Sequence, residues 1–255
     1  MGALDGAHAL ITGGGTGIGA AIARALAGEG AAISIAGRRK APLNDMVARL
    51  PKATAIVADI TKPEDCATMV AAARAAHGPI DIVIANAGAA SSAPAAKITP
   101  ALWQDAIGVN LTGAFFTAQA ALADVTRKSD TPRRIVFIAS TAGLKGYPYV
   151  AAYVAAKHGV VGLARALSIE LASTGVTVNA VCPGFTDTPL LAAAAEKISA
   201  KTGRSIEDAR RELAKDNDNG RLITPEEVAL AVLRLCLPQG ASINGQAIEI
   251  TGEAA

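Results

Sequence analysis

Apolar residues along this chain occur in two alternating patterns. Short, almost continuously apolar runs predict seven strands, at residues 7–12, 31–36, 54–58, 80–85, 133–139, 175–181 and 246–250. Longer alanine-rich stretches with helical spacing predict helices at residues 17–29, 40–50, 63–77, 101–128, 151–173 and 225–236. Near-continuous apolar strands that alternate with helices are typical of a parallel sheet covered on both faces. The pattern therefore predicts one α/β domain, residues 1–255.

One charged segment, residues 187–222, interrupts this alternation between the sixth strand and the last helix. Connections of about two to six residues suffice at such a place, so a long excursion there predicts a substrate lid. Its basic side chains are interleaved with acids, which fits either a solvated amphipathic helix or a lid whose basic edge meets a phosphate group. These basic residues include Lys197, Lys201, Arg204, Arg210, Arg211 and Lys215.

Charge and cysteine content narrow the class of protein. The 255 residues include 24 basic and 22 acidic side chains, a net charge of +2, which argues against a nucleic-acid partner. No apolar run approaches the roughly 18 residues of a membrane span, and the N-terminus has no signal-peptide pattern. The cysteines are few, odd in number and widely spaced, so we expect no disulfides, no metal and a cytoplasmic location. They are Cys66, Cys182 and Cys236; the histidines, His8, His77 and His158, are expected at the surface or in packing.

The first predicted strand runs directly into a glycine-rich turn, which is followed by a helix. The turn reads Thr12-Gly13-Gly14-Gly15-Thr16-Gly17-Ile18-Gly19. Glycines at positions 13, 17 and 19 permit a tight turn, close approach to a pyrophosphate and close packing of the helix on the strand. This context predicts a dinucleotide-binding turn.

The turn and the motifs after it resemble the short-chain dehydrogenase/reductase family, over essentially residues 5–252. The turn matches the family pattern TGxxxGxG, and the other motifs follow in order: Asp59, Asn86-Ala87-Gly88, Asn110, Ser140, Tyr153-x-x-x-Lys157 and Pro183-Gly184. The resemblance implies a single-domain, Rossmann-like, doubly wound parallel sheet of about seven strands. It also implies an oxidoreductase that moves a hydride between a nicotinamide and a carbonyl or secondary alcohol.

The cofactor implied by the resemblance is NADP(H) or NAD(H). At the end of the second strand Gly37 stands where NAD-dependent relatives carry aspartate, and Arg38 follows, which favours NADP(H). NAD(H) stays possible, because Thr16 stands where NADP-type relatives often carry a basic residue, and the basic loop could simply be solvated. The expected cofactor contacts are Gly13, Gly15, Thr16, Gly17, Ile18, Gly19, Arg38, Arg39, Asp59, Ile60, Asn86, Ala87, Gly88, Tyr153, Lys157, Pro183, Gly184, Thr186 and Thr188.

The expected proton donor is Tyr153, since a developing alkoxide needs a positioned general acid. Lys157 lies four positions further on the same helix face, where its ammonium would lower the pKa of the phenol. By resemblance, Ser140 binds the substrate oxygen and Asn110 holds a water for proton relay. Together these four residues form the expected catalytic group.

The substrate pocket is expected to include Ser140, Leu144, Tyr147, Tyr149 and Phe185. The stretch VNAVCPGFTDTPLL and the long lid resemble ketoreductases and 3-hydroxyacyl-CoA dehydrogenases of the family. We therefore expect a 3-oxoacyl or 3-hydroxyacyl thioester, carried on CoA or an acyl carrier protein, or a related β-keto compound. A free secondary alcohol, cyclic ketone or polyol is the alternative, and a non-catalytic dinucleotide sensor is a remote one.

The chain is expected to form a homotetramer. The final strand, residues 245–250, lies at the sheet edge, and an uncovered apolar edge favours association. Two distinct two-fold interfaces would generate a D₂ tetramer. The second interface is expected on helices 101–128 and 151–173, with Trp103 in an interface or the core. Small residues there would permit close helix approach unless they only pack against the chain's own sheet: Ala114, Ala118, Ala121, Ala152, Ala155, Ala156 and Ala166.

Overall fold

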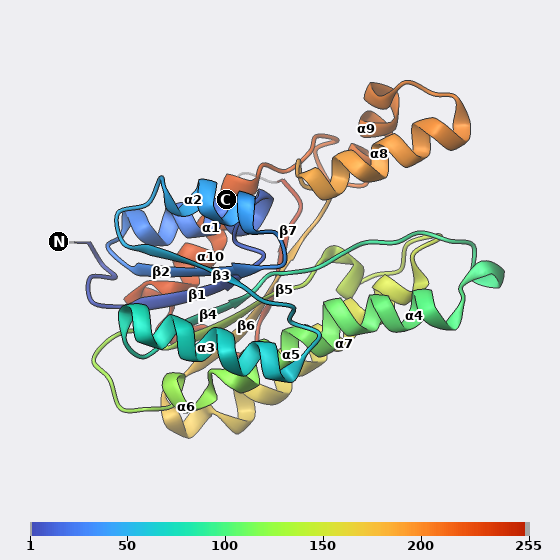
Figure 1. Cartoon of the computed structure of the whole chain (residues 1–255). Coiled ribbons are helices and arrows are strands. Elements are labelled where there is room, and N and C mark those ends of the chain that lie inside the picture. The colour runs from blue at the N-terminus through green and yellow to red at the C-terminus, as the bar shows by residue number, and fades with distance from the viewer. Residues whose placement is uncertain (1, 253–255) are drawn as a thin grey trace.

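A seven-stranded parallel sheet forms the centre of the molecule in the computed structural model, which describes residues 2–252 (Figure 1). The strands are β1 (His8–Thr12), β2 (Ala32–Gly37), β3 (Ala53–Val57), β4 (Ile82–Ala85), β5 (Arg134–Ile138), β6 (Thr177–Pro183) and β7 (Ala247–Ile250). Their order is β3-β2-β1-β4-β5-β6-β7, so the direction of strand addition reverses between β1 and β4. Ligands of doubly wound sheets bind at such a reversal, beyond the carboxyl ends of the strands. The predicted fold class is confirmed.

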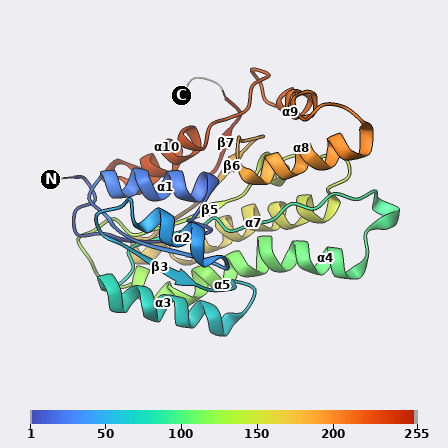
Figure 2. The ribbon, with the colours of Figure 1, turned by 45° about the horizontal axis from the view of Figure 1, so that its top comes forward.

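Helices cover both faces of the sheet (Figures 1 and 2). One face carries α1 (Gly17–Gly28), α2 (Lys40–Val47) and α10 (Pro225–Cys236); the other carries α3 (Pro63–His77), α5 (Gly113–Ala120) and α7 (Ala151–Glu170). Each face has its own hydrophobic cluster, built from side chains of the strands and of its helices. No helix within residues 2–252 is long and apolar enough to cross a bilayer.

Most of the alanines expected at a helix interface pack inside the chain instead. Only two of the seven, Ala155 and Ala166, are exposed. The other five are buried against the chain's own core: Ala114, Ala118, Ala121, Ala152 and Ala156. Alanine at these positions lets α5 and α7 approach the sheet closely, so the small residues do not themselves indicate a second interface.

The single helix predicted over residues 101–128 is wrong, because the segment is divided. It comprises α4 (Pro100–Ile107), a π-helical turn (Gly108–Thr112), α5 and the short α6 (Leu122–Val125). Asn110 lies in the π turn, and its side-chain amide donates to the carbonyl of Ala106 at 2.9 Å. In an α-helix that carbonyl would accept from the backbone N–H of Asn110, so the side chain competes with the regular pattern. Such π turns recur at functional sites.

The 187–222 excursion contains two helices, α8 (Pro189–Thr202) and α9 (Ile206–Ala214), which project from one end of the molecule (Figure 1). Thr188 caps α8 by accepting from Leu191 N–H at 3.3 Å, and Pro189 occupies the first turn. Ser205 caps α9 in the same way. Short 3₁₀ turns complete the described chain, at Ala95–Lys97, Thr141–Gly143, Ala172–Thr174 and Pro238–Ser242.

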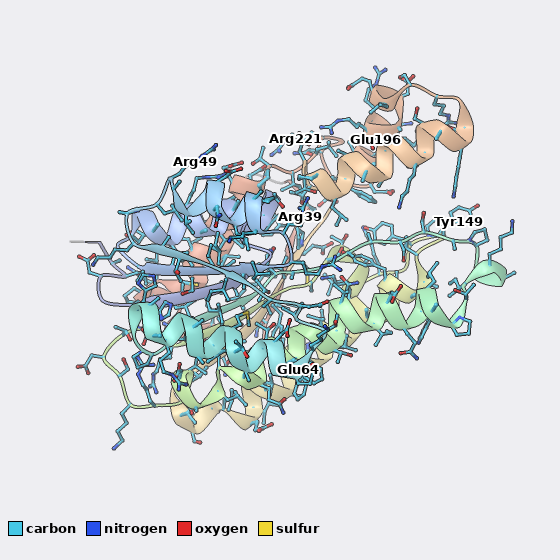
Figure 3. All side chains as sticks on the ribbon, in the orientation of Figure 1. Arg39, Arg49, Glu64, Tyr149, Glu196 and Arg221 are labelled. Atoms are coloured by element: carbon cyan, nitrogen blue, oxygen red, sulfur yellow. The ribbon has the colours of Figure 1, made fainter. Side chains whose placement is uncertain are left out.

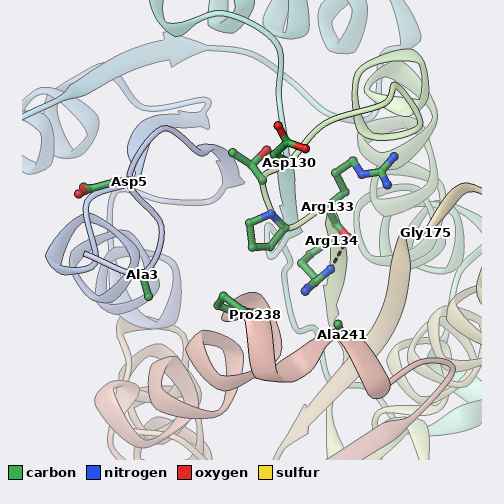
Figure 4. A pocket seen from close by; sticks show the side chains of 10 residues that line it. Ala3, Asp5, Asp130, Arg133, Arg134, Gly175, Pro238 and Ala241 are labelled. Carbon is green, nitrogen blue, oxygen red and sulfur yellow. Dashed lines mark hydrogen bonds between the residues drawn. The ribbon is translucent and has the colours of Figure 1, made fainter. Parts of the chain in front are cut away.

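At the opposite end of the sheet, a hollow of about 380 Å³ is lined by Arg133, Arg134 and Pro238 among others (Figure 4). The buried guanidinium of Arg134 donates to the carbonyls of Leu235 at 2.9 Å and Leu237 at 3.4 Å. These carbonyls lie at the C-terminus of α10, where the helix dipole is negative. Arg134 therefore fastens α10 to the start of β5.

Near this end, His8 of β1 is buried in a hydrogen-bonded position. Its Nδ1 lies 2.8 Å from the carbonyl oxygen of Gly78, and its Nε2 lies 2.8 Å from the hydroxyl of Ser34. Burial is the main cause that lowers the pKa of His8, and the neighbouring His77 adds to this. His8 is thus a packing residue held neutral, whereas His158 is exposed.

We predict that acid destabilises the fold partly through His8. The unfolded chain binds a proton at this site near pH 6.5 and the folded chain only at lower pH, so stability falls as pH drops through 6.5. Urea unfolding at pH 8.0 and 5.5 should show a smaller acid loss in His8→Asn than in the wild type. The control His158→Asn should keep the wild-type loss; an equal loss in His8→Asn would contradict this.

Candidate active site

The glycine-rich turn between β1 and α1 forms a cradle that side chains would fill. Gly13 and Gly17 have φ of 67° and 54°, in the left-handed region that favours glycine. A Cβ at Gly19 would lie 2.4 Å from the carbonyl oxygen of Gly13. Thr16 precedes α1 but makes no side-chain cap, so the first N–H groups of this helix keep the capacity to bind an anion. This backbone fits the pyrophosphate of a dinucleotide.

The remaining turn residues complete the cradle. Gly15 lies against the backbone of Pro42. Ile18 is half-buried and packs on the hydrophobic cluster beneath α1. A Cβ at Gly17 would stand 3.2 Å from the methyl group of Thr188. The turn therefore meets the loop that follows β6.

Asn86, after β4, joins the two central strands. Its side-chain amide donates to the carbonyl of Thr12 at 2.8 Å, and its backbone N–H donates to the Thr12 hydroxyl at 3.1 Å. Ala87 N–H donates to the same hydroxyl at 3.2 Å. Thr12 was not singled out from the sequence, although its place as the last residue of β1 could have indicated this role. These bonds fix the turn relative to β4.

The region expected to bind the adenosine end carries exposed positive charge. Arg38 and Arg39 follow β2 and are exposed, and Figure 3 shows Arg39 at the end of the sheet from which α8 projects. Hydrogen bonds from Thr61 hold the pKa of Asp59 below its usual value, and the charge of Arg38 contributes. Ile60, an expected cofactor contact, is buried and packs on Gly113.

Ser140, Tyr153 and Lys157 come together from the end of β5 and from α7. The Lys157 ammonium is buried, donates to the carbonyl of Ile138 at 2.7 Å and lies 5.6 Å from the centre of the Tyr153 ring. Ser140 follows β5, its hydroxyl accepts from Ala142 N–H at 3.1 Å, and the same hydroxyl acts to lower the pKa of Tyr153. Gly143 permits this approach, because a Cβ there would stand 2.7 Å from the carbonyl oxygen of Lys157. Three of the four expected catalytic side chains are thus neighbours.

The pKa of Tyr153 departs from the expected direction. Desolvation raises it above the ordinary value, and the hydrogen bond of Ser140 opposes this rise. Burial lowers the pKa of Lys157 to about 8, since its ammonium lacks a carboxylate partner and is satisfied by the Ile138 carbonyl. Tyr153 therefore keeps its proton at neutral pH, which suits a general acid.

Asn110 is buried in the π turn and clamps the loop after β4. Its amide donates to the carbonyl of Ala89 at 2.8 Å, and its carbonyl oxygen accepts from Ala89 N–H at 3.2 Å. Gly88 lies between Asn110 and Lys157: a Cβ there would be 2.9 Å from Asn110 Oδ1 and 3.8 Å from Lys157 Nζ. Asn110 thus borders the group of Ser140, Tyr153 and Lys157.

Aromatic side chains stand beside this group. The hydroxyls of Tyr147 and Thr141 lie 2.8 Å apart, and the rings of Tyr147 and Phe185 meet edge to face with centroids 5.8 Å apart. Leu144 is exposed at the same segment. Tyr149 is 66% exposed, has φ of 67°, and accepts from Ala93 N–H through its carbonyl (Figure 3).

After β6 the chain turns from the sheet into the 187–222 excursion. Pro183 is the last, buried residue of β6, and Gly184 N–H donates to Ile250 of β7 at 2.9 Å. The Thr186 hydroxyl donates back to Gly184 at 3.0 Å, whereas Thr188 caps α8. Both threonines, expected to reach the cofactor, serve local backbone geometry here.

Three basic residues of the 187–222 excursion form ion pairs with acids of the same segment. Arg210 lies 2.8 Å from Asp187, and the other two pairs are Arg211–Asp208 and Lys215–Glu212. Asn217, which the sequence analysis did not single out, is buried beneath this segment. Within residues 2–252, no three His, Cys, Asp or Glu side chains gather as metal ligands.

Comparison with known proteins gives consistent matches over the whole chain. The family model described as short chain dehydrogenase matches residues 7–199. A Streptomyces coelicolor protein named as a ketoacyl reductase is 37% identical over 99% of this chain and 98% of its own length. A D-beta-hydroxybutyrate dehydrogenase of Cupriavidus necator is 39% identical over 90% of each chain.

Among solved structures, a phenylalanine-to-tryptophan variant of actinorhodin polyketide ketoreductase with NADPH superposes with a TM-score of 0.92. Its sequence is 36% identical, and the match covers 99% of this chain and 98% of that one.

Proposed function

The chain belongs to the short-chain dehydrogenase/reductase family of oxidoreductases, and on that premise we propose that it uses NADPH to reduce the ketone of a 3-oxoacyl thioester or a related β-keto compound. The observation that carries the proposal is the group formed by Ser140, Tyr153 and Lys157. It lies at the carboxyl ends of the strands, as the glycine-rich cradle does, so a proton donor and a dinucleotide site share one end of the sheet.

The chain's own residues have distinct tasks in this reaction. When bound, the nicotinamide supplies the hydride. Tyr153 donates its hydroxyl proton to the substrate oxygen, where negative charge develops, and Ser140 hydrogen-bonds the same oxygen. Lys157, a buried cation, stabilises the phenolate left on Tyr153. Lys157 and Asn110 begin the relay that returns a proton to Tyr153.

Two observations support a carrier-bound β-keto substrate. By their names, one relative acts on ketoacyl groups and another on β-hydroxybutyrate, whose hydroxyl is on the carbon β to the carboxyl group. Lys197 and Lys201 on α8 and Arg204 beyond it form no ion pair within residues 2–252, so their charge is free for a phosphate of CoA or of a carrier protein. The hydroxybutyrate relative equally favours a free secondary alcohol as the second candidate.

We predict NADPH-dependent reduction of acetoacetyl-CoA, and loss of turnover by about 10²–10⁴-fold in Tyr153→Phe, which keeps the ring and removes the donor. Absorbance at 340 nm measures both, with acetoacetate and cyclohexanone as competing ketones. Preference for a free ketone would favour the second candidate, an enzyme that acts on free secondary alcohols and ketones. Dinucleotide binding without reduction of any ketone would instead favour the sensor, and a fully active Tyr153→Phe would refute the assigned acid.

We predict that Arg38 selects NADPH by binding the 2′-phosphate of that dinucleotide. A charge-assisted hydrogen bond contributes about 1.5–3 kcal/mol, so Arg38→Ala should weaken NADPH binding roughly ten- to hundredfold and leave NADH nearly unchanged. Fluorescence titration of both dinucleotides gives the affinities. Arg49→Ala, which removes an arginine far from Arg39 in Figure 3, is the control. Equal losses for both dinucleotides, or wild-type preference for NADH, would contradict this selection.

We also propose a homotetramer in a cytoplasmic location. β7 is an edge strand, and its side chains are incompletely buried. On the helices of the expected second interface, the large apolar side chains of Trp103 on α4 and Ile169 on α7 are exposed. Leu230 is exposed on α10, the last α-helix before the edge strand β7. Three free, buried cysteines suit a reducing compartment.

Light scattering at micromolar concentration should therefore give about four times the chain mass of 25.6 kDa. Ile169→Glu, which places a charge in an apolar contact, should reduce the assembly to dimers, whereas Ile206→Glu, the same change at an exposed position of α9 outside the two expected interfaces, should not. A monomeric wild type would exclude the tetramer.

A further inference from the structure

Asn217 is buried within a run of charged and exposed residues. It follows α9, lies in the sequence KDNDNGR, and is 3% exposed, while its neighbours on both sides are exposed. A buried amide must find hydrogen-bond partners, because leaving it unpaired would be costly. Its partners show what the burial achieves.

The amide of Asn217 binds both ends of the lid. Its Oδ1 accepts from Phe185 N–H at 2.9 Å, and its Nδ2 donates to the carbonyls of Phe185 at 2.8 Å and Arg221 at 2.7 Å. Both N–H groups of the amide are therefore used. The contact is so close that a Cβ at Gly184 would lie 2.3 Å from Asn217 Oδ1. Gly184 is therefore required here by the Asn217 amide.

Backbone bonds hold the same place from the other side. Ile223 N–H donates to the carbonyl of Phe185 at 3.0 Å, and Asp187 N–H donates to that of Ile223 at 2.8 Å. The backbone of Phe185 thus lies between the Asn217 amide and the strand-like segment at Ile223. Little freedom remains for the position of its side chain.

Fixing Phe185 has a consequence at the catalytic group. Its ring meets the ring of Tyr147 edge to face, and the Tyr147 hydroxyl bonds Thr141, the residue after Ser140. A continuous series of contacts therefore runs from the lid base to the residue that binds the substrate oxygen. Asn217 itself does not belong to that group.

We propose that Asn217 is a specificity-determining positioning residue: by fixing Phe185 against Tyr147, it sets the wall that faces the substrate and so decides which ketones are accepted. The proposal rests on the proposed function, because it concerns the substrate side of the same site. A purely structural role would instead lower activity toward every ketone in the same proportion.

The test compares Asn217→Asp and Asn217→Ala with the wild type. Aspartate keeps the shape but cannot donate to the Phe185 and Arg221 carbonyls. We expect the ratio of kcat/KM for a large ketone thioester to that for acetoacetyl-CoA to change about tenfold, through KM of the thioester. The affinity for NADPH should stay within about twofold. A ratio unchanged in both variants would overturn the proposal.

Asn219→Ala is the matched control, since Asn219 belongs to the same loop but bonds Gly252 and Arg221 rather than Phe185. It should keep the wild-type ratio. If the Asn217 variants fold poorly, Phe185→Leu should shift the ratio in their place. Failure of this substitution to shift the ratio would also overturn the proposal.

Hydrogen exchange at the Phe185 amide separates this proposal from the proposed function. Exchange should be slow in the wild type and Asn219→Ala, and at least about tenfold faster in Asn217→Ala, which removes the oxygen that accepts from Phe185 N–H, whether or not any ketone is reduced. An inactive wild type with this exchange pattern would refute the function alone. Unchanged exchange would refute the positioning role.

Discussion

The hydrogen bonds between Thr12 and Asn86 are the constraint on which the site depends. They cross from β1 to β4 at the place where the order of the sheet reverses. On one side of this junction lies the glycine-rich turn, and on the other lies the loop that Asn110 clamps. Because direct hydrogen bonds between the ends of β1 and β4 form this junction, both halves of the site are held in fixed positions relative to each other.

The fold was largely predictable because its signals are local. Each strand is an apolar run, and strands and helices alternate along the chain apart from the 187–222 excursion, so this alternation predicts the architecture. The helix predicted over 101–128 was wrong, because Asn110 carries an amide that competes for the Ala106 carbonyl, and a hydrophobic pattern does not report such competition. The alanines of α5 and α7 were ambiguous for a related reason: small size permits close approach to any partner.

The site was predictable only in part. The residues of the motifs lie where the sequence order places them, and Tyr153 and Lys157 share a helix face. Asn217 could not be found this way, since a polar residue within KDNDNGR carries no sign of burial. Its environment arises from residues more than thirty positions away in the chain. The direction of the Tyr153 pKa likewise depends on desolvation, which requires the packed structure.

The way in which the two ends of the 187–222 excursion are joined affects how enzymes of this family can change in evolution. The backbones of Phe185 and Ile223, at the two ends of the excursion, are hydrogen-bonded to each other. The segment therefore leaves and rejoins the domain at one place. Insertions, deletions or wholesale replacement between these ends need not disturb the register of β6 or the start of α10. Because Asn217 lies inside the excursion and holds the backbone of Phe185, a replacement segment would keep Phe185 in place only if it supplied an equivalent amide.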